Sequence, residues 1–280
     1  MTQTPFTPFH INATADDLAG NDGIGRYIFL PGSDGRAREI ASHFSKVTVK
    51  AHPRGHNLYL GTLQFERKKI EVASIASGMG CPSMEIILHE LFHLGAKRFL
   101  RVGTAGSLQP DYIPIGSLIN VQASVRDEDT TVHYAPREFP AIASLEMISA
   151  ALLAAEKIGL SDKLHTGIVH CKSSFYAREF GAGPLSTENN AYIDLLTRTG
   201  TLASEMETSA LFIQSHLYNH RLMQEGVDAA HRVLAGAVLG IIAVPPHLTE
   251  DSELIPQTIE NNVQLAIETI KMLAAQELLG

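Results

Sequence analysis

Cysteine is almost absent from this sequence of 280 residues, with Cys81 and Cys171 as its two examples. Two cysteines without metal-ligand spacing argue against a cysteine-based metal site, and they fit reduced thiols in a cytoplasmic protein. Basic residues are also outnumbered, because 22 Lys and Arg stand against 30 Asp and Glu and give a net charge of −8. This balance argues against nucleic acid and anionic membranes as partners, so an anionic ligand requires a local cluster of arginines.

Long apolar runs are missing as well. The longest, Val233 to Val244, is shorter than the ~20 residues that a membrane-spanning helix needs. The segment before Arg26 contains no Lys, no Arg and no apolar block, so we expect no secretory signal and no membrane partner. No linker rich in Pro, Ser, Gly or charge divides the chain, and we see no internal repeat. We therefore expect one domain that covers residues 1–280.

Strand-like and helix-like segments alternate along most of the chain. This alternation predicts an α/β fold, in which a mostly parallel or mixed sheet is covered by helices on both faces. The predicted strands are 27–30, 47–50, 57–63, 70–75, 97–102, 117–123, 165–171 and 238–244. The predicted helices are 37–44, 82–94, 144–157, 256–279 and one that opens at 204–210.

The stretch from Lys97 to Gly106 combines an apolar strand with an arginine, and we expect the strand to break at Gly103-Thr104-Ala105-Gly106. The rigid fork of Arg101 suits a phosphate. Gly103 and Gly106 would let backbone N–H groups approach the same anion. Arg101 could equally be the partner of a buried carboxylate, and the residues alone leave both interpretations open.

Glycine-containing loops follow two other predicted strands, around Gly32 and Gly78. Ligands of α/β sheets collect at the carboxyl ends of the strands, so we expect Gly32, Gly78 and Gly103 to lie near one site. The loop around Gly32 leads into a helix, an arrangement that favours phosphate. The glycine spacing fits neither a P-loop nor a dinucleotide-binding fingerprint.

Other candidate residues have an ordinary structural interpretation beside a functional one. His10 and Arg54 fit solvated side chains on a terminal segment and in a turn. Phe175 offers a shelf for a planar ligand but also fits core packing. Glu205 and Glu207 fall in the predicted first turn of a helix, where acidic side chains usually stabilise the helix dipole.

Six separated motifs follow one another along the chain: Phe9-His10-Ile11, Pro31-Gly32-x-x-x-Arg36, Ser77-Gly78-Met79-Gly80-x-Pro82-Ser83, Phe99-Leu100-Arg101-Val102-Gly103-Thr104-x-Gly106, Ser174-Phe175-Tyr176 and Glu205-Met206-Glu207. In this order the chain resembles the nucleoside phosphorylase family with a single-domain α/β fold, and within it most closely the uridine phosphorylases. The resemblance runs from about Pro8 to Leu273. It implies a three-layer αβα sandwich whose central mixed sheet is partly barrel-like. It also implies a homo-oligomer, either a dimer or a hexamer built as a trimer of dimers, in which residues 1–25 contribute to a neighbouring subunit's site.

The same resemblance implies phosphorolysis of a nucleoside, with inorganic phosphate as co-substrate, no cofactor and no metal. It assigns phosphate binding to Gly32, Arg36, Arg101 and Thr104, with Arg54 supplied by a neighbouring subunit. It assigns the ribose to Met206 and Glu207, and to His10 across a subunit boundary. It assigns the base to Thr104, Gly106, Phe175, Tyr176 and Glu205. The catalytic set is then Arg36, Arg101, Thr104 and Glu207.

The base-binding loop departs from the family pattern. Glu179 stands where the bacterial uridine phosphorylases have a uracil-reading Gln, and Gly181 stands where they have an Arg. We therefore place Glu179 at the base and expect Arg178 to replace the missing donor. The purine enzymes carry an Asp after the last strand, where this chain reads Ala243-Val244-Pro245-Pro246. Residues 219–231 look like an insertion relative to the bacterial uridine phosphorylases. Gly55 stands where some relatives have a Glu that helps them to bind a monovalent cation.

Phosphorolysis of uridine or a related pyrimidine nucleoside is the leading prediction. A purine or broad-specificity nucleoside phosphorylase, a hydrolytic nucleosidase and a nonenzymatic nucleoside-binding protein of the same fold are the alternatives. Hydrolytic relatives tend to lose the phosphate arginines, so Arg36, Arg54 and Arg101 argue against the nucleosidase. The altered positions Glu179 and Gly181 keep the nonenzymatic alternative open.

Overall fold

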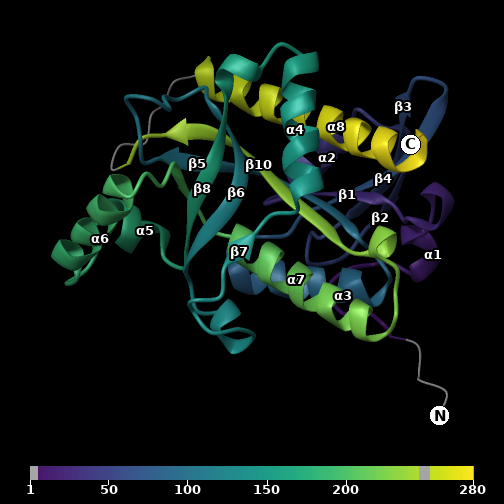
Figure 1. Cartoon of the computed structure of the whole chain (residues 1–280), viewed down its shortest axis with the longest axis horizontal. Coiled ribbons are helices and arrows are strands. Elements are labelled where there is room, and N and C mark those ends of the chain that lie inside the picture. Colours follow the sequence, from purple (N-terminus) through teal and green to yellow (C-terminus); the bar gives the residue numbers. More distant parts are fainter. Residues whose placement is uncertain (1–5, 246–252, 280) are drawn as a thin grey trace.

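The computed structural model describes residues 6–245 and 253–279, in which the strands form one mixed sheet with helices on both faces (Figure 1). The strands are β1 (Tyr27–Pro31), β2 (Ser45–Lys50), β3 (Leu58–Phe65), β4 (Lys68–Ile75), β5 (Arg98–Ser107), β6 (Leu118–Asp127), β7 (Ala141–Ile142), β8 (Leu164–Lys172), β9 (Ala203–Glu205) and β10 (Leu234–Ala243). The α-helices are α1 (Ala15–Leu18), α2 (Asp34–Ala41), α3 (Cys81–His93), α4 (Leu145–Lys157), α5 (Phe175–Phe180), α6 (Ser186–Arg198), α7 (Thr208–Gln224) and α8 (Leu254–Leu279). Within these residues, no helix is both long enough and apolar enough to cross a membrane.

Part of the sheet closes on itself. The strand order is β10-β6-β8-β9-β5-β1-β4-β3-β2, and β10 also pairs with β5. The strands β5, β10, β6, β8 and β9 therefore form a ring, while β1 to β4 continue from β5 as an open sheet. β1 runs parallel to both β4 and β5, so the carboxyl ends of these strands lie at one edge. The predicted mixed, partly barrel-like sheet is confirmed.

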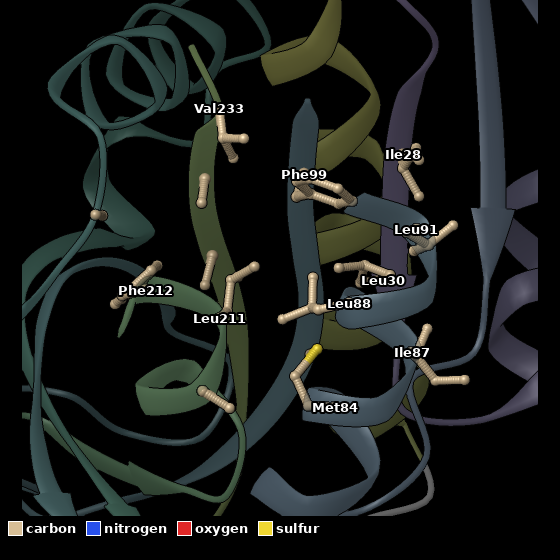
Figure 2. Packing of buried hydrophobic residues seen from close by; sticks show 14 of the residues in the cluster. Ile28, Leu30, Met84, Ile87, Leu88, Leu91, Phe99, Leu211, Phe212 and Val233 are labelled. Carbon is tan, nitrogen blue, oxygen red and sulfur yellow. The ribbon is translucent and has the colours of Figure 1, made fainter. Parts of the chain in front are cut away.

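Two apolar cores fill the spaces between the sheet and the helices. Alternate residues of β1 face opposite sides, so Ile28 belongs to one core and Phe29 to the other. On the first side, α3 and α7 cover the sheet, and Figure 2 shows Leu88 of α3 and Leu211 of α7 among the packed side chains. On the second side the cover is α2, α4 and α8. These layers confirm the predicted αβα sandwich.

The helix α3 shows how the sequence specifies such a layer. Pro82 stands in its first turn, where a missing N–H costs nothing, and Gly95 follows its last turn with a left-handed φ of 89°. Met84, Leu88 and Leu91 recur at helical spacing and are buried. Replacing Leu88 by alanine would cost about 2–5 kcal/mol of unfolding free energy, because the cavity would remain partly empty.

The strand β5 continues through Gly103 and Gly106, so the prediction that it breaks there is wrong. β5 pairs with β10 as far as Gly106, and the ladder holds the backbone extended. A Cβ atom at Gly103 would lie 2.8 Å from the Leu239 side chain and 3.0 Å from Nη2 of Arg101. A Cβ at Gly106 would lie 2.9 Å from Pro245. The two glycines therefore make room for neighbouring side chains.

The predicted helix at residues 204–210 is also partly wrong. Ala203–Glu205 forms β9, which pairs with β5 on one side and with β8 on the other, and α7 begins at Thr208. α2 begins three residues earlier than predicted, so Arg36 lies in its first turn. The helix α6 was not predicted, because most of its side chains are polar or exposed. In the 219–231 segment, α7 continues to Gln224, and no residue of the segment lines the cavity described below.

Candidate active site

A cavity of about 780 Å³ lies at the carboxyl ends of β1, β5 and β8, beside the connection from β9 to α7. This volume lies within the roughly 300–1,000 Å³ that small-molecule sites occupy. Most of the residues that the sequence assigned to phosphate, ribose and base line this one cavity. They are Gly32, Arg36, Arg101, Thr104, Gly106, Phe175, Tyr176, Glu179, Glu205, Met206 and Glu207. The structure thus brings together segments that are far apart in the sequence.

Arg101 is the cation at the centre of the site. Its side chain is 5% exposed, and it contacts Glu205 through Nε at 3.3 Å and Glu207 through Nη2. The third nitrogen, Nη1, is buried and has no hydrogen-bond partner among the described residues. A buried guanidinium N–H without a partner is costly, and an anion in the cavity would satisfy it. Both interpretations of Arg101 therefore have support, since it pairs with buried carboxylates and keeps one donor free.

Glu205 holds the local frame. Its carboxylate accepts the N–H of Glu207 at 2.9 Å and the N–H of Thr208 at 3.0 Å, which are the first donors of α7. Burial alone would raise the pKa of Glu205, but Arg101 and the hydrogen bonds from Thr208 and Glu207 lower it below its ordinary value. An ionised Glu205 fixed in this way orients Arg101. The contacts support a structural role for Glu205 more directly than the expected contact with the base.

Glu207 lies at the end of the β9–α7 connection and lines the cavity. It accepts the N–H of Gly80 at 2.6 Å and pairs with Nη2 of Arg101. Burial raises the pKa of Glu207 above its ordinary value, and Arg101 opposes that shift. Because carboxylate oxygens accept hydrogen bonds, Glu207 can bind a pair of hydroxyl groups at this place. Met206 lines the cavity next to it.

The first turn of α2 supplies a second cation. Ser33 caps this helix by accepting the N–H of Arg36 at 3.3 Å, and Gly32 precedes it. Nε of Arg36 pairs with Glu39 at 2.8 Å, and both side chains are partly exposed. The helix N-terminus, Arg36 and Arg101 therefore bring donors and positive charge to the lining of the cavity. Thr104 adds a hydroxyl to this lining.

Aromatic side chains also line the cavity. Phe175 and Tyr176 begin α5, with ring centroids 5.2 Å apart and edge-to-face geometry, and Tyr176 is 70% exposed. Nζ of Lys172 lies 5.6 Å from the centroid of the Phe175 ring and 2.5 Å from a carboxylate oxygen of Glu179. A planar ligand can lie against these rings while polar groups contact its edge.

The chain is similar to known proteins over most of its length. The family model described as the phosphorylase superfamily matches residues 26–275. The chain belongs to this superfamily. It is 34% identical to the uridine phosphorylase of Treponema pallidum (strain Nichols), over 96% of this chain and 95% of the relative.

Two further relatives bear on the base. The chain is 33% identical to the uridine phosphorylase of Thermococcus kodakarensis, over 76% of this chain and 73% of the relative. It is also 31% identical to a DeoD-type purine nucleoside phosphorylase of Streptococcus uberis, over 87% of this chain and 88% of the relative. Superfamily membership therefore agrees with the resemblance found in the sequence, whereas similarity spans both pyrimidine and purine enzymes.

Arg178 does not line the cavity of this superfamily member. Its guanidinium donates to the carboxylate of Asp127 through Nε at 2.6 Å and Nη2 at 2.9 Å. Nη1 donates to the side-chain oxygen of Asn189 at 2.6 Å. It also lies over the ring of Tyr192, 4.5 Å from the centroid. On α5 the buried Glu179 faces the cavity, and Arg178 precedes it by one residue, about 100° around the helix. The expectation that Arg178 replaces the missing base donor is therefore not supported by its position.

His10 and Arg54 lie together in a second cavity of about 560 Å³, and neither lines the first. The ring of His10 contacts Glu90 at 2.7 Å, and Glu90 also accepts the backbone N–H of Phe9 at 3.0 Å. Burial would raise the pKa of Glu90, but the His10 contacts and that N–H lower it. Met79 lines both cavities. Within one chain, His10 and Arg54 are thus separate from the Arg101 site.

Sequence reasoning missed Lys172 and Met79 as lining residues. Lys172 directly follows the predicted strand 165–171, at the end of the strand where ligands gather, and that position was an available signal. Met79 stands in the glycine-containing loop 77–83 but offers no polar group that would single it out. Within residues 6–245 and 253–279, no cluster of three or more His, Cys, Asp or Glu side chains could hold a metal ion. Of the expected purine-enzyme position, Pro246 lies outside the described residues.

Proposed function

We propose that this protein is a nucleoside phosphorylase that converts uridine, or a related pyrimidine nucleoside, and inorganic phosphate to the free base and ribose 1-phosphate. The observation that carries the proposal is Arg101, a buried guanidinium held by two carboxylates with one donor left for an anion. The uridine phosphorylases among the relatives support the choice of reaction. Phosphate is the co-substrate, and neither a cofactor nor a metal takes part.

The residue types fit the chemistry. The reaction passes through a cation-like ribosyl group, so the site has to hold a dianion below C1′ and keep the sugar in position. In this proposal Gly32, Arg36, Arg101 and Thr104 bind the phosphate. These donors hold the attacking phosphate in line with C1′, and misplacing a reactant by about 1 Å can cost about 10²-fold in rate.

Glu207 accepts hydrogen bonds from the ribose hydroxyls and thereby fixes C1′ over the phosphate, with Met206 against the sugar. Positioning of this kind can supply several kcal/mol of the barrier, because the reactants no longer have to be oriented from solution. Phe175 and Tyr176 lie against the base. The C1′–N bond breaks with its electron pair on the base, and a phosphate oxygen forms the new bond to C1′. No side chain has to act as nucleophile.

We further propose that the sites are shared in a homo-oligomer, a dimer or a hexamer built as a trimer of dimers, of cytoplasmic location. His10 and Arg54 then complete the site of a neighbouring subunit, with Arg54 at the phosphate and His10 at the ribose. Their joint position in a second, open cavity supports this proposal, because neither side chain lines the Arg101 cavity of its own chain.

A panel of nucleosides with and without phosphate, followed by chromatography for free base, tests the proposal. Phosphate-dependent release of uracil is expected. Equal release without phosphate would instead identify a hydrolytic nucleosidase, and no release from any nucleoside would identify a binding protein. Release of a purine base faster than that of uracil would instead identify a purine nucleoside phosphorylase, such as the similar enzyme of Streptococcus uberis.

A further inference from the structure

A buried lysine and glutamate line the cavity close to Phe175. Lys172 is 1% exposed and Glu179 is 8% exposed, and Nζ lies 2.5 Å from Oε1. A Cβ atom at Gly106 would be 3.7 Å from the same oxygen, so the pair lies beside the backbone of β5. Burying two charges costs free energy of folding, and a hydrophobic pair would often stabilise the fold equally well. This pair therefore calls for a role in ligand binding.

The donors of Lys172 are not all used. An ammonium group carries three N–H donors. One reaches Ser204 Oγ at 3.0 Å. Glu179 pairs with Nζ at 2.5 Å, but its Oε1 accepts no hydrogen bond from the described residues. The carbonyl oxygen of Glu205 lies 3.5 Å away, at the outer limit of a hydrogen bond. A ligand oxygen in the cavity can take this third donor at a shorter distance.

A chain of hydrogen bonds holds Lys172 in place. Asp127 can only accept, so Nε2 of His170 donates to it at 2.9 Å. Nδ1 of His170 then accepts from the Ser204 hydroxyl at 3.0 Å, and Ser204 in turn accepts from Lys172. Burial lowers the pKa of His170, with Asp127 opposing, which agrees with this neutral tautomer. Every member has one consistent direction of donation from Lys172 to Asp127.

We infer that Lys172 and Glu179 together read the edge of the base, with Lys172 donating to a ring carbonyl oxygen and Glu179 accepting the adjacent ring N–H. The inference rests on the proposed phosphorolysis. The substrate class is a nucleoside whose base carries a carbonyl next to an N–H, as the imide edge of uracil does. Lys172 thus supplies the base donor that we expected from Arg178 in the sequence analysis.

Lys172 also acts on the chemical step. When the C1′–N1 bond breaks, its electron pair stays with the base, and the negative charge spreads to the ring carbonyl oxygens. An ammonium group that donates to one of these oxygens stabilises that charge in a site of low dielectric. Ser204 and His170 are positioning residues, because they act on the base through Lys172.

The test compares Lys172→Met with Lys157→Met, which removes a lysine that is 47% exposed and pairs with Glu268 outside the cavity. Phosphorolysis of uridine and of 5-fluorouridine is measured at varied phosphate. Since 5-fluorouracil is the better leaving group, it depends less on Lys172. We expect Lys172→Met to lower kcat/KM for uridine by about 100-fold or more. The loss in kcat/KM for 5-fluorouridine should be about tenfold smaller than the loss for uridine. The phosphate KM should stay within about threefold of wild type. Lys157→Met should keep wild-type kinetics.

Lys172→Met leaves Glu179 buried without its cation, so a second variant, Lys172→Met with Glu179→Met, removes both charges and preserves packing. It should show the same loss and should no longer discriminate uridine from 3-methyluridine, which lacks the N3–H. A folded variant of either kind with the wild-type ratio of uridine to 5-fluorouridine turnover overturns this assignment and leaves phosphorolysis standing. A wild-type protein that releases no uracil overturns the proposed function and this assignment with it.

Discussion

Replacing Arg101 by methionine separates the two roles of this guanidinium. Arg101 holds the buried carboxylates of Glu205 and Glu207, keeps Nη1 without a partner, and lines the cavity that we assign to phosphate. The change removes both the structural cation and the proposed ligand of the anion. Activity and stability should therefore fall together, in amounts that can be worked out from the contacts.

The cost in stability falls mainly on Glu207. After the change, Glu205 keeps the N–H of Glu207 and both the N–H and the hydroxyl of Thr208. Glu207 keeps the N–H of Gly80. Removing one member of a buried ion pair costs about 3–5 kcal/mol, and we expect the lower end because Glu205 stays hydrogen-bonded. Loss of a donor that positions the attacking phosphate should lower kcat/KM by at least about 10²-fold.

The loss of stability should depend on pH. Burial raises the pKa of Glu207 above its ordinary value of 4.5, and without Arg101 it should rise further. A carboxyl whose pKa is raised by folding contributes its full stability below the unfolded pKa and loses it as the pH rises through the folded pKa. The deficit of Arg101→Met against wild type should therefore be small near pH 4.5 and larger at pH 8, as thermal melts at both pH values can measure.

Arg98→Met is the matched control. Arg98 lies on the same strand, is 1% exposed, and pairs with Glu277 at 2.5 Å while donating to the carbonyl of Arg232 at 2.6 Å. It does not line the cavity. This variant should lose stability but keep kcat and phosphate KM within about threefold when assayed well below its Tm. An Arg101→Met protein with wild-type Tm and normal phosphate KM would refute the reasoning, as would an equal loss of activity in the control.

Three further predictions concern shared sites, His170 and Arg178. Mixing inactive Arg54→Ala and Glu207→Ala proteins under conditions of subunit exchange should restore some activity, because a hybrid dimer has one intact site; demonstrated exchange without activity would count against shared sites. Burial lowers the pKa of His170 in the folded protein, so wild type should lose stability as the pH falls from about 6.5 through this lowered pKa. The Tm of His170→Gln should therefore change less between pH 7 and pH 5 than the Tm of wild type. Arg178→Ala should lower Tm by removing the bidentate contact with Asp127, and it should leave kcat/KM for uridine within about threefold; a larger kinetic loss at unchanged Tm would return Arg178 to the base.

Local elements were predictable where the signal lies within a few residues. The limits of α3 follow from a proline at its start, a glycine after its end and apolar residues at helical spacing between them. The strands β1 and β4 were also predicted closely, because short apolar runs stop at glycine-containing loops. The convergence of Gly32 and Gly103 on one cavity followed from the rule that ligands gather at the carboxyl ends of parallel strands, whereas Gly78, expected with them, does not line it.

The errors arose where distant partners decide the outcome. β9 is three residues long and exists because β5 and β8 flank it, so its own residues could not indicate a strand. Gly103 and Gly106 read as a strand end, but neighbouring side chains explain them as close-packing positions inside β5. Arg178 was expected to replace the missing donor at the base, whereas the turn of α5 directs it toward Asp127.

By itself, the sequence determined the α/β class, the superfamily resemblance and the residue types that a phosphate and a ribose would need. These depend on local periodicity and on motifs that keep their spacing along the chain. Only the tertiary structure decided that Arg101 pairs with two carboxylates and keeps Nη1 without a partner, and that Lys172 pairs with Glu179. Both depend on β5, β8 and β9 lying side by side, and strand pairing over long separations is set by the packing of the whole sheet.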